Sequence, residues 1–154
     1  MYIEFKKPAE KDGSEIATWK YKGEYSFYNN DKTEAKNQWA KNIHKEENTF
    51  VIYNEKNELI GNCSFDYDDG KYMLGVQMKP ELTGKGMGTE FTKSILEFGI
   101  KEYDFDSIEL LVAKFNKRAI RVYEKLDFEK IDDFTWDVNG ETKEFIAMKK
   151  EYNK

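Results

Sequence analysis

The sequence predicts an α/β fold in which helices flank one mixed, mostly antiparallel twisted sheet of about seven strands. Residues 49–78 contain consecutive strand-like runs joined by short polar turns, as in an antiparallel meander. A helix-like run and then another apolar strand-like run follow, which makes a strand–helix–strand crossover. Near the C-terminus, an Asn-Gly pair predicts a tight hairpin between the last two strands.

The N-terminal third combines one strand with helical or irregular chain. Residues 2–6 (YIEFK) alternate as an opening strand does, and Pro8 follows them. A helical or irregular region comes next and ends in the segment 33–47. Trp39 and Ile43 lie four positions apart in that segment, so a helix would place both on one buried face.

The three strand-like runs of the meander are well delimited. TFVIYN (49–54) and ELIGNCSF (58–65) are separated by the polar turn EKN, and KYMLGVQM (71–78) ends before Pro80. Cys63, in the second run, is expected to be a buried strand residue. As the single cysteine, it excludes an internal disulfide and any site with several cysteine ligands.

The C-terminal half predicts two helices and three strands. The apolar residues that follow the glycines have helical spacing: Met87, Phe91, Ile95 and Phe98. SIELLVA (107–113) is apolar on both faces, as in a central strand. A second helix begins at the N-cap candidate Asn116. This helix carries Ile120, Tyr123 and Leu126 on one face. The closing strands lie near 128–138 and 143–149, on either side of Asn139-Gly140.

The totals favour one soluble globular domain over residues 1–154. The net charge of −5 argues against nucleic acid as a partner, because phosphate binding needs a basic surface. We expect a cytoplasmic protein without a membrane partner, since the N-terminus lacks an apolar signal core and no apolar run has membrane-spanning length. The single histidine, His44, is expected to be a solvated surface residue, and no metal is expected.

The run LTGKGMGTEF contains glycine at 84, 86 and 88, between a strand and a helix. A helix start leaves backbone N–H groups unpaired, and glycines let a phosphate approach those amides. A P-loop is excluded because GxxxxGK must be followed by Ser or Thr, whereas Gly86 follows Lys85 here. A Rossmann fingerprint is excluded because Thr89 and Phe91 occupy its glycine positions. A plain tight turn is the alternative.

A second pattern lies one strand later. Asn116 and Tyr123 are seven residues apart, which is about two turns of one helix. A routine cap with a core tyrosine would explain this pair by itself. Together with the glycine run, it points instead to one ligand-binding arrangement.

Taken together, VQMKPELTGKGMG and LLVAKFNKRAIRVYEKLDF resemble the GNAT superfamily of acetyl-CoA-dependent N-acetyltransferases, over about residues 59–130. The family's motifs read Gln/Arg-x-x-Gly-x-Gly/Ala and, roughly, Asn-x-x-Ala-x-x-x-Tyr-x-x-x-Gly-Phe. The chain departs from them at Thr83, where Gln or Arg is usual, and at Asp127, where glycine is usual. Since the ligand contacts are mainly backbone amides, Thr83 should weaken the phosphate cradle without abolishing it. Asp tolerates the left-handed conformation that a helix end needs at position 127.

The resemblance implies a sheet that splays between its fourth and fifth strands to admit pantetheine. It also implies acetyl-CoA as co-substrate, with the pyrophosphate on the amides of Thr83–Gly88 and pantetheine along Val76–Met78. The implied cofactor-binding residues are Val76, Gln77, Met78, Thr83, Gly84, Lys85, Gly86, Met87, Gly88, Thr89, Asn116, Arg118, Ala119 and Tyr123.

The implied reaction is direct attack of a primary amine on the acetyl carbonyl, and Tyr123 matches the family's proton donor to the departing CoA thiolate. A strand amide at Val76 or Met78 would polarise the carbonyl oxygen. The general base stays open. Glu24, Asp66 and Asp68 border the expected acceptor cleft, yet each also fits an exposed turn.

The acceptor is expected to bind the N-terminal half, where aromatic residues surround a carboxylate and would suit a cationic amine. The residues that we select are Trp19, Glu24, Tyr25 and Tyr28. Covering one side of the sheet explains them equally well. The acceptor can be a small-molecule or a peptide amine, and a homodimer is possible. Two alternative functions also stay open: a CoA-binding sensor without turnover and a nucleotide-binding protein of another class.

Overall fold

The structure, a computed structural model, describes residues 1–138 and 140–152. Its seven strands form one sheet in the order β1-β2-β3-β4-β5-β7-β6. The strands are β1 (Ile3–Lys6), β2 (Thr49–Asn54), β3 (Leu59–Asp68), β4 (Lys71–Met78), β5 (Ser107–Ala113), β6 (Glu129–Val138) and β7 (Glu141–Glu151). The α-helices are α1 (Glu10–Ile16), α2 (Glu34–Lys41), α3 (Gly88–Tyr103) and α4 (Lys117–Lys125). Short 3-10 helices span Gly23–Tyr28, Ile43–Lys45 and Pro80–Leu82.

The sheet is mixed, as predicted. β1 pairs with β2 and β2 with β3 in antiparallel fashion, and so do β5 with β7 and β7 with β6. β4 and β5 are parallel, with Met73 opposite Glu109. A parallel pair needs a crossover, and α3 provides it because it lies between these two strands in the chain. The predicted fold class is therefore confirmed.

The chain divides into two compact units. The N-terminal unit contains Met1–Ser64 and Val76–Thr83, and the C-terminal unit contains Phe65–Gly75 and Gly84–Lys154. Both units thus draw on β3 and β4.

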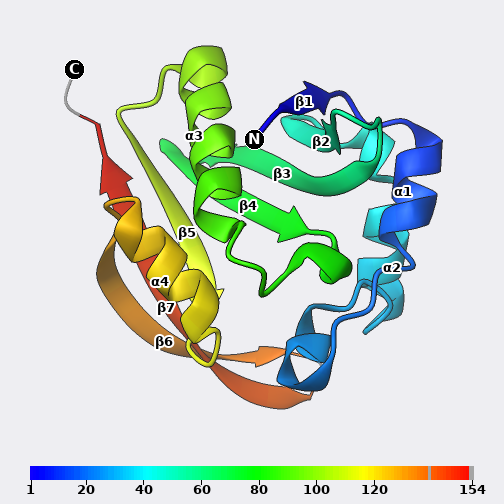
Figure 1. Ribbon diagram of the computed structural model, residues 1–154. Helices are drawn as coiled ribbons and strands as arrows, with labels where there is room; N and C mark the ends of the chain where they lie inside the picture. Colours follow the sequence, from blue (N-terminus) through cyan, green and yellow to red (C-terminus); the bar gives the residue numbers. More distant parts are fainter. Residues whose placement is uncertain (139, 153–154) are drawn as a thin grey trace. The chain divides into compact units, whose positions relative to one another are not determined.

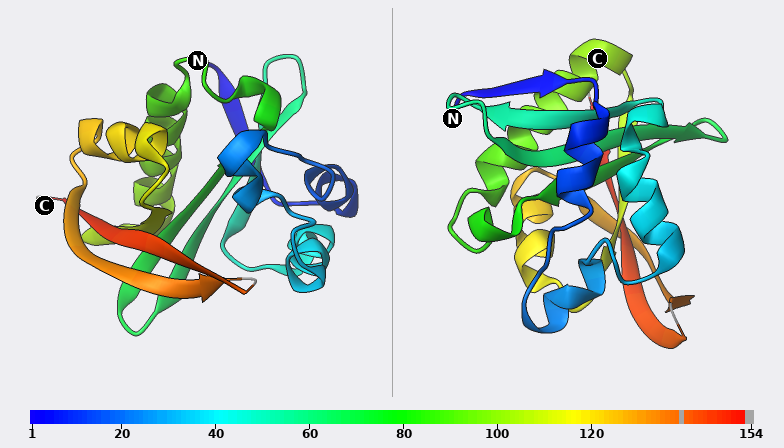
Figure 2. Two further views of the ribbon diagram at one scale, coloured as in Figure 1. Left: turned by 90° about the horizontal axis from the view of Figure 1, so that it is seen from below. Right: turned by 90° about the vertical axis from the view of Figure 1, so that its right-hand side faces the viewer.

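The N-terminal unit has a core where α1 and α2 meet β2 and β3. Figure 2 shows these two helices side by side. Their close contact requires Gly13, because a Cβ there would lie 2.6 Å from the carbonyl oxygen of Ala40. The core side chains are Ile16, Ala17, Trp19, Ala40, Ile43, Val51, Tyr53 and Leu59.

Two sequence predictions in this unit were wrong in detail. Ile43 is buried, but Trp39 is 38% exposed. The reason is that α2 ends at Lys41 and Ile43 begins a 3-10 helix, so the two residues do not share one α-helical face.

His44 is only partly solvated, because its Nε2 lies 3.6 Å from Oε1 of Glu10 and its Nδ1 is buried. Cys63 is 1% exposed, as expected, and burial raises the pKa of its thiol.

The C-terminal unit places α3 and α4 side by side over β5 and β7 (Figure 1). The strands bury Ile108, Leu110 and Met148. α3 buries Phe91 and Ile95, as its apolar spacing predicts. Met87 and Phe98, from the same predicted face, are half-buried.

The closing hairpin is also confirmed. Val138 lies opposite Glu141 in the β6–β7 ladder, which leaves a connection of two residues. Gly140 adopts a φ of +78°, and Asn139 lies outside the described residues. β7 is longer than predicted, because it pairs with β5 on one side and with β6 on the other.

Candidate active site

The glycine loop of the C-terminal unit changes hand just before α3. Gly84 and Gly86 have φ values of +73° and +78°, in the left-handed region that glycine adopts without strain. Met87, the next residue, is right-handed with φ −93° and ψ −9°. A left-handed residue beside a right-handed one turns successive N–H groups toward one point, which makes a concave site for an anion.

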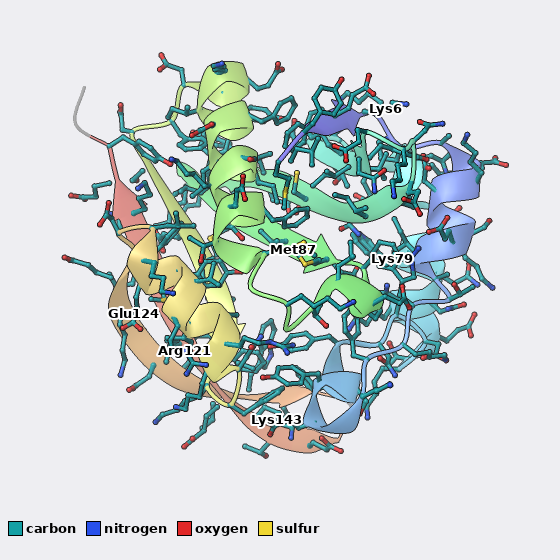
Figure 3. All side chains as sticks on the ribbon, viewed as in Figure 1. Lys6, Lys79, Met87, Arg121, Glu124 and Lys143 are labelled. Atoms are coloured by element: carbon teal, nitrogen blue, oxygen red, sulfur yellow. The ribbon has the colours of Figure 1, made fainter. Side chains whose placement is uncertain are left out.

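The start of α3 is not capped by a side chain. Its N-cap residue is Met87, which makes no side-chain cap hydrogen bond. Figure 3 shows Met87 at this end of the helix. The first N–H groups of a helix have no partner within it, and the helix dipole adds positive potential there. This end of α3 therefore suits a negatively charged ligand.

Each glycine of the loop has its own physical reason. A side chain at Gly84 would bring its Cβ within 2.7 Å of Nη1 of Arg118. At Gly88, the Cβ would lie 3.1 Å from Cγ2 of Val122, so glycine there lets α3 pack closely on α4. Gly86 faces open space and is needed for its backbone conformation alone. The loop is thus both a turn and a place where the Arg118 guanidinium lies over bare backbone.

The start of α4 is fixed by Asn116. Its Oδ1 accepts a hydrogen bond of 3.1 Å from the backbone N–H of Ala119. This confirms the predicted N-cap. The end of the helix is followed by Asp127 with φ +71°, the left-handed conformation expected at that position.

Tyr123 is half-buried on α4. Its ring packs edge-on against Phe128, with 5.6 Å between the ring centroids. Its carbonyl oxygen accepts hydrogen bonds of 3.0 Å from the N–H groups of Leu126 and Phe128. The ring contact and the backbone hydrogen bonds together hold Tyr123 in place near the end of α4, just before β6. Arg121 and Glu124, on the same helix, are exposed (Figure 3).

In the N-terminal unit, Thr83 is engaged in its own turn. Its Oγ1 donates a hydrogen bond of 2.7 Å to the carbonyl oxygen of Pro80, and its N–H donates one of 3.1 Å to the same atom. This amide therefore already has a partner. We predicted it as a ligand donor together with those of residues 84–88.

The end of β4 carries a polar network that sequence reasoning missed. Gln77 Oε1 accepts hydrogen bonds from Nδ2 of Asn62 at 3.0 Å and from Nδ2 of Asn30 at 3.4 Å. The Met78 carbonyl oxygen accepts one of 2.6 Å from the Tyr21 hydroxyl. A polar strand residue between apolar ones, Gln77 between Val76 and Met78, was the only signal of this network in the sequence.

The acceptor-site candidates differ in accessibility. Trp19 is 4% exposed and belongs to the core cluster, so its side chain packs inside the N-terminal unit. Glu24 is exposed on the 3-10 helix Gly23–Tyr28. Tyr25 and Tyr28 are half-buried on the same helix. Glu24 and the two tyrosines are thus the candidates that a ligand can reach.

The predicted site residues divide between the two units. The C-terminal unit contains Gly84, Lys85, Gly86, Met87, Gly88, Thr89, Asn116, Arg118, Ala119 and Tyr123. The N-terminal unit contains Trp19, Glu24, Tyr25, Tyr28, Val76, Gln77, Met78 and Thr83. In the described part of the chain, no three His, Cys, Asp or Glu side chains are grouped so that they could hold a metal ion. None of the helices described is long and apolar enough to cross a membrane.

The uncapped start of α3, the left-handed glycines before it and the adjacent Arg118 guanidinium together suit an anionic ligand. Residues 5–129 match the family described as "Acetyltransferase (GNAT) domain". The chain therefore belongs to the GNAT family of acetyltransferase domains, as its motifs indicated.

Individual relatives agree with this assignment. The chain is 27% identical over 120 residues to a spermidine N(1)-acetyltransferase of Escherichia coli, which covers 75% of this chain and 64% of that protein. It is 28% identical over 83 residues to an uncharacterized N-acetyltransferase, p20, of Bacillus licheniformis, and the match covers 52% of this chain and 47% of that protein. The chain thus spans between about half and two thirds of the length of these curated relatives.

Solved structures show the same fold. A GNAT-family acetyltransferase from Bacillus anthracis superposes with a TM-score of 0.79 at 18% identity, covering 97% of this chain and 94% of that one. A spermidine N-acetyltransferase from Vibrio cholerae, solved in complex with CoA and spermine, has a TM-score of 0.74 at 18% identity and covers 97% and 95%.

Proposed function

We propose that this protein transfers an acetyl group from acetyl-CoA to a primary amine. The observation that carries the proposal is the start of α3, which lacks a side-chain cap, follows left-handed Gly84 and Gly86, and lies beside the Arg118 guanidinium. Acetyl-CoA brings a pyrophosphate, an anion of suitable charge and size for converging amides and a guanidinium. A guanidinium from α4 would also supply the charge that Thr83 does not.

The remaining contacts to the donor are proposed from the family's motifs. The amides of Gly84–Gly88 and of Thr89 would hold the pyrophosphate, with Lys85 and Met87 contributing backbone. Asn116 and Ala119 would contact the pantetheine arm near the start of α4. The edge of β4 at Val76–Met78 would hydrogen-bond pantetheine as a neighbouring strand does, and one of its amides would polarise the acetyl carbonyl.

The chemistry that we propose is a direct transfer. The neutral amine nitrogen forms a bond to the acetyl carbon, and the carbon–sulfur bond breaks as the tetrahedral adduct collapses. The Tyr123 hydroxyl donates a proton to the departing thiolate, and the proton that the amine loses restores the phenol by way of solvent. The thioester is already activated, so positioning is the main task of the protein. We assign no residue as the general base.

The acceptor that we propose is a cationic amine, with polyamines as the first class to test. The relatives named as spermidine N-acetyltransferases support this choice. The net charge of −5 of this chain also favours a cationic substrate. Glu24, with Tyr25 and Tyr28 on the same 3-10 helix, offers a carboxylate beside aromatic rings.

Two measurements, made one after the other, test the proposal. Acetyl-CoA should raise the melting temperature, whereas ATP and NAD should not, because only a ligand that binds the native state stabilises it. Thiol release is then followed across spermidine, spermine, single amino acids, aminoglycosides and peptides. Stabilisation without thiol release from any amine would indicate a CoA sensor, and stabilisation by ATP or NAD alone would overturn the proposal.

A further inference from the structure

The last peptide group of β4, between Met78 and Lys79, is held from both sides. The Lys79 N–H donates a hydrogen bond of 2.8 Å to the carbonyl oxygen of Ile60, on β3. The Met78 carbonyl oxygen accepts one of 2.6 Å from the Tyr21 hydroxyl. One side of this peptide group is thus fixed by the neighbouring strand and the other by a side chain.

The direction of these bonds places Tyr21 on one edge of β4. No peptide bond in the structure described is cis, and in a trans peptide the N–H and C=O point in opposite directions. Since the Lys79 N–H points toward β3, the Met78 carbonyl points away from it. Successive N–H groups along a strand point to opposite sides. Since that of Lys79 points toward β3, the N–H groups of Met78 and Val76 point away from it as well. Tyr21 therefore lies on the edge that presents these two amides.

Tyr21 itself is held by a tight loop. Its backbone N–H donates a hydrogen bond of 2.6 Å to Oδ1 of Asn29, across the 3-10 helix. The next residue, Asn30, is buried and donates from Nδ2 to the carbonyl oxygen of Ile16 at 2.9 Å and to Gln77 Oε1 at 3.4 Å. The loop that carries Tyr21 is thus tied both to α1 and to β4.

The Tyr21 hydroxyl remains a donor over the working pH range. Burial raises the pKa of its phenol, and the charge of Glu81 acts in the same direction, while a hydrogen bond with Gln77 opposes them. A phenol that stays protonated cannot be the base of the reaction, but it can hold a carbonyl oxygen permanently.

We propose that Tyr21 is a positioning residue that holds the β4 edge in the geometry needed to orient the thioester. This inference rests on the proposed acetyl transfer. By donating a hydrogen bond to the Met78 carbonyl oxygen, Tyr21 fixes the end of β4. It does so on the edge where the amides of Val76 and Met78 would hydrogen-bond pantetheine and the acetyl oxygen. A misplaced thioester should cost rate rather than affinity, because neither Tyr21 nor the Met78 carbonyl is among the groups proposed to hold the phosphates.

The test compares Tyr21→Phe with Tyr53→Phe. Both variants delete one phenolic hydroxyl of the N-terminal unit that makes a hydrogen bond, since Tyr53 donates to Oδ1 of Asp12. Tyr53 is on β2, which β3 separates from β4 in the sheet. Melting temperature, acetyl-CoA Kd, kcat with the best amine and amide exchange of the 76–79 segment are measured for both. Tyr21→4-aminophenylalanine, which keeps an N–H donor, serves as the rescue variant.

We expect Tyr21→Phe to lower kcat by between about tenfold and about a hundredfold, with acetyl-CoA Kd changed by less than about twofold. Exchange at 76–79 should rise in this variant alone, and 4-aminophenylalanine should restore both kcat and protection. The pH dependence of kcat/KM should keep its shape, since Tyr21 transfers no proton.

Equal kcat for Tyr21→Phe and Tyr53→Phe in an active enzyme would overturn the positioning role, as would unchanged exchange at 76–79. Failure of the unaltered protein to release thiol with any amine is a different result. It would overturn the proposed function, and it is seen before any variant is compared.

Discussion

At the residue scale, the proposed proton transfer depends on Tyr123. Replacing it with Phe removes the hydroxyl but keeps the ring contact with Phe128, so the fold should persist. We expect kcat to fall by roughly a hundredfold or more, as for loss of a general acid, while acetyl-CoA Kd changes little. Steady-state thiol release and calorimetric binding measure the two quantities.

The matched control for Tyr123 is Tyr67→Phe, because Tyr67 is in the same unit, is 60% exposed and is not one of the proposed site residues. Its kcat should equal that of the unaltered protein. If Tyr123→Phe also retained full kcat, the thiolate would have to take its proton from another source, and Tyr123 would be a packing residue of α4.

Arg118 is the second residue on which the site depends. Because its guanidinium lies over Gly84, Arg118→Gln should raise the acetyl-CoA Kd by roughly tenfold without changing kcat. The salt dependence of Kd should become weaker, since one charged contact is lost. Lys125→Gln, an equal loss of charge at the opposite end of α4, should leave Kd unchanged. Equal effects of the two variants would mean that only net charge matters.

At the scale of elements, the start of α4 combines a structural and a proposed binding role. Asn116 caps the helix through Oδ1, so Asn116→Ala should lower the free energy of unfolding by about 1 kcal/mol. Asn116→Ser keeps a capping oxygen and should restore most of that loss. If the amide also contacts pantetheine, Asn116→Ser should still raise the acetyl-CoA Kd by roughly threefold to tenfold. Full recovery of both quantities would limit Asn116 to the cap.

The helices also show where local patterns succeed and fail. α3 follows its apolar spacing in the middle of the helix, where Phe91 and Ile95 are buried. Trp39 departs from its spacing because α2 stops two residues before Ile43. Helix ends depend on what packs against them, and the sequence shows that only when a cap residue marks the end, as Asn116 marks the start of α4.

At the scale of the whole molecule, Lys36 should make stability depend on pH. Burial, with the positive charge of Lys32 in addition, lowers the pKa of Lys36 from 10.5 to about 8. Between these values the unfolded chain binds more protons than the native one, so this group makes the free energy of unfolding rise with pH. Below about pH 8 its destabilising effect is fully present.

Lys36→Met should therefore be more stable than the parent protein at pH 7, and the difference should shrink as the pH approaches 10.5. Urea unfolding at several pH values measures it. Lys41→Met, at the exposed end of α2, is the comparison and should leave the rise with pH in place. A constant difference between Lys36→Met and the parent across this range would mean that Lys36 is not desolvated.

The backbone features of the candidate site were predictable from the sequence because they are local. Glycine spacing, a helix start and a capping asparagine are local features, and Gly84, Gly86 and Asn116 have the conformations that these features imply. The accessibility of the residues selected as acceptor-site candidates was not predictable. Trp19 and Tyr25 look equivalent in the sequence, but Trp19 is in the core and Tyr25 is half-buried on a 3-10 helix.

By itself, the sequence determined the mixed sheet, the crossover and the closing hairpin, because periodicity and turn residues act over a few positions. The family was indicated separately, by the resemblance of two motifs to those of GNAT proteins. Only the tertiary structure decided that Arg118 lies over Gly84 and that Tyr21 takes the carbonyl of Met78, 57 positions away. Contacts between residues so distant in sequence depend on how the elements pack. The type of a residue does not by itself specify which distant residue will lie beside it.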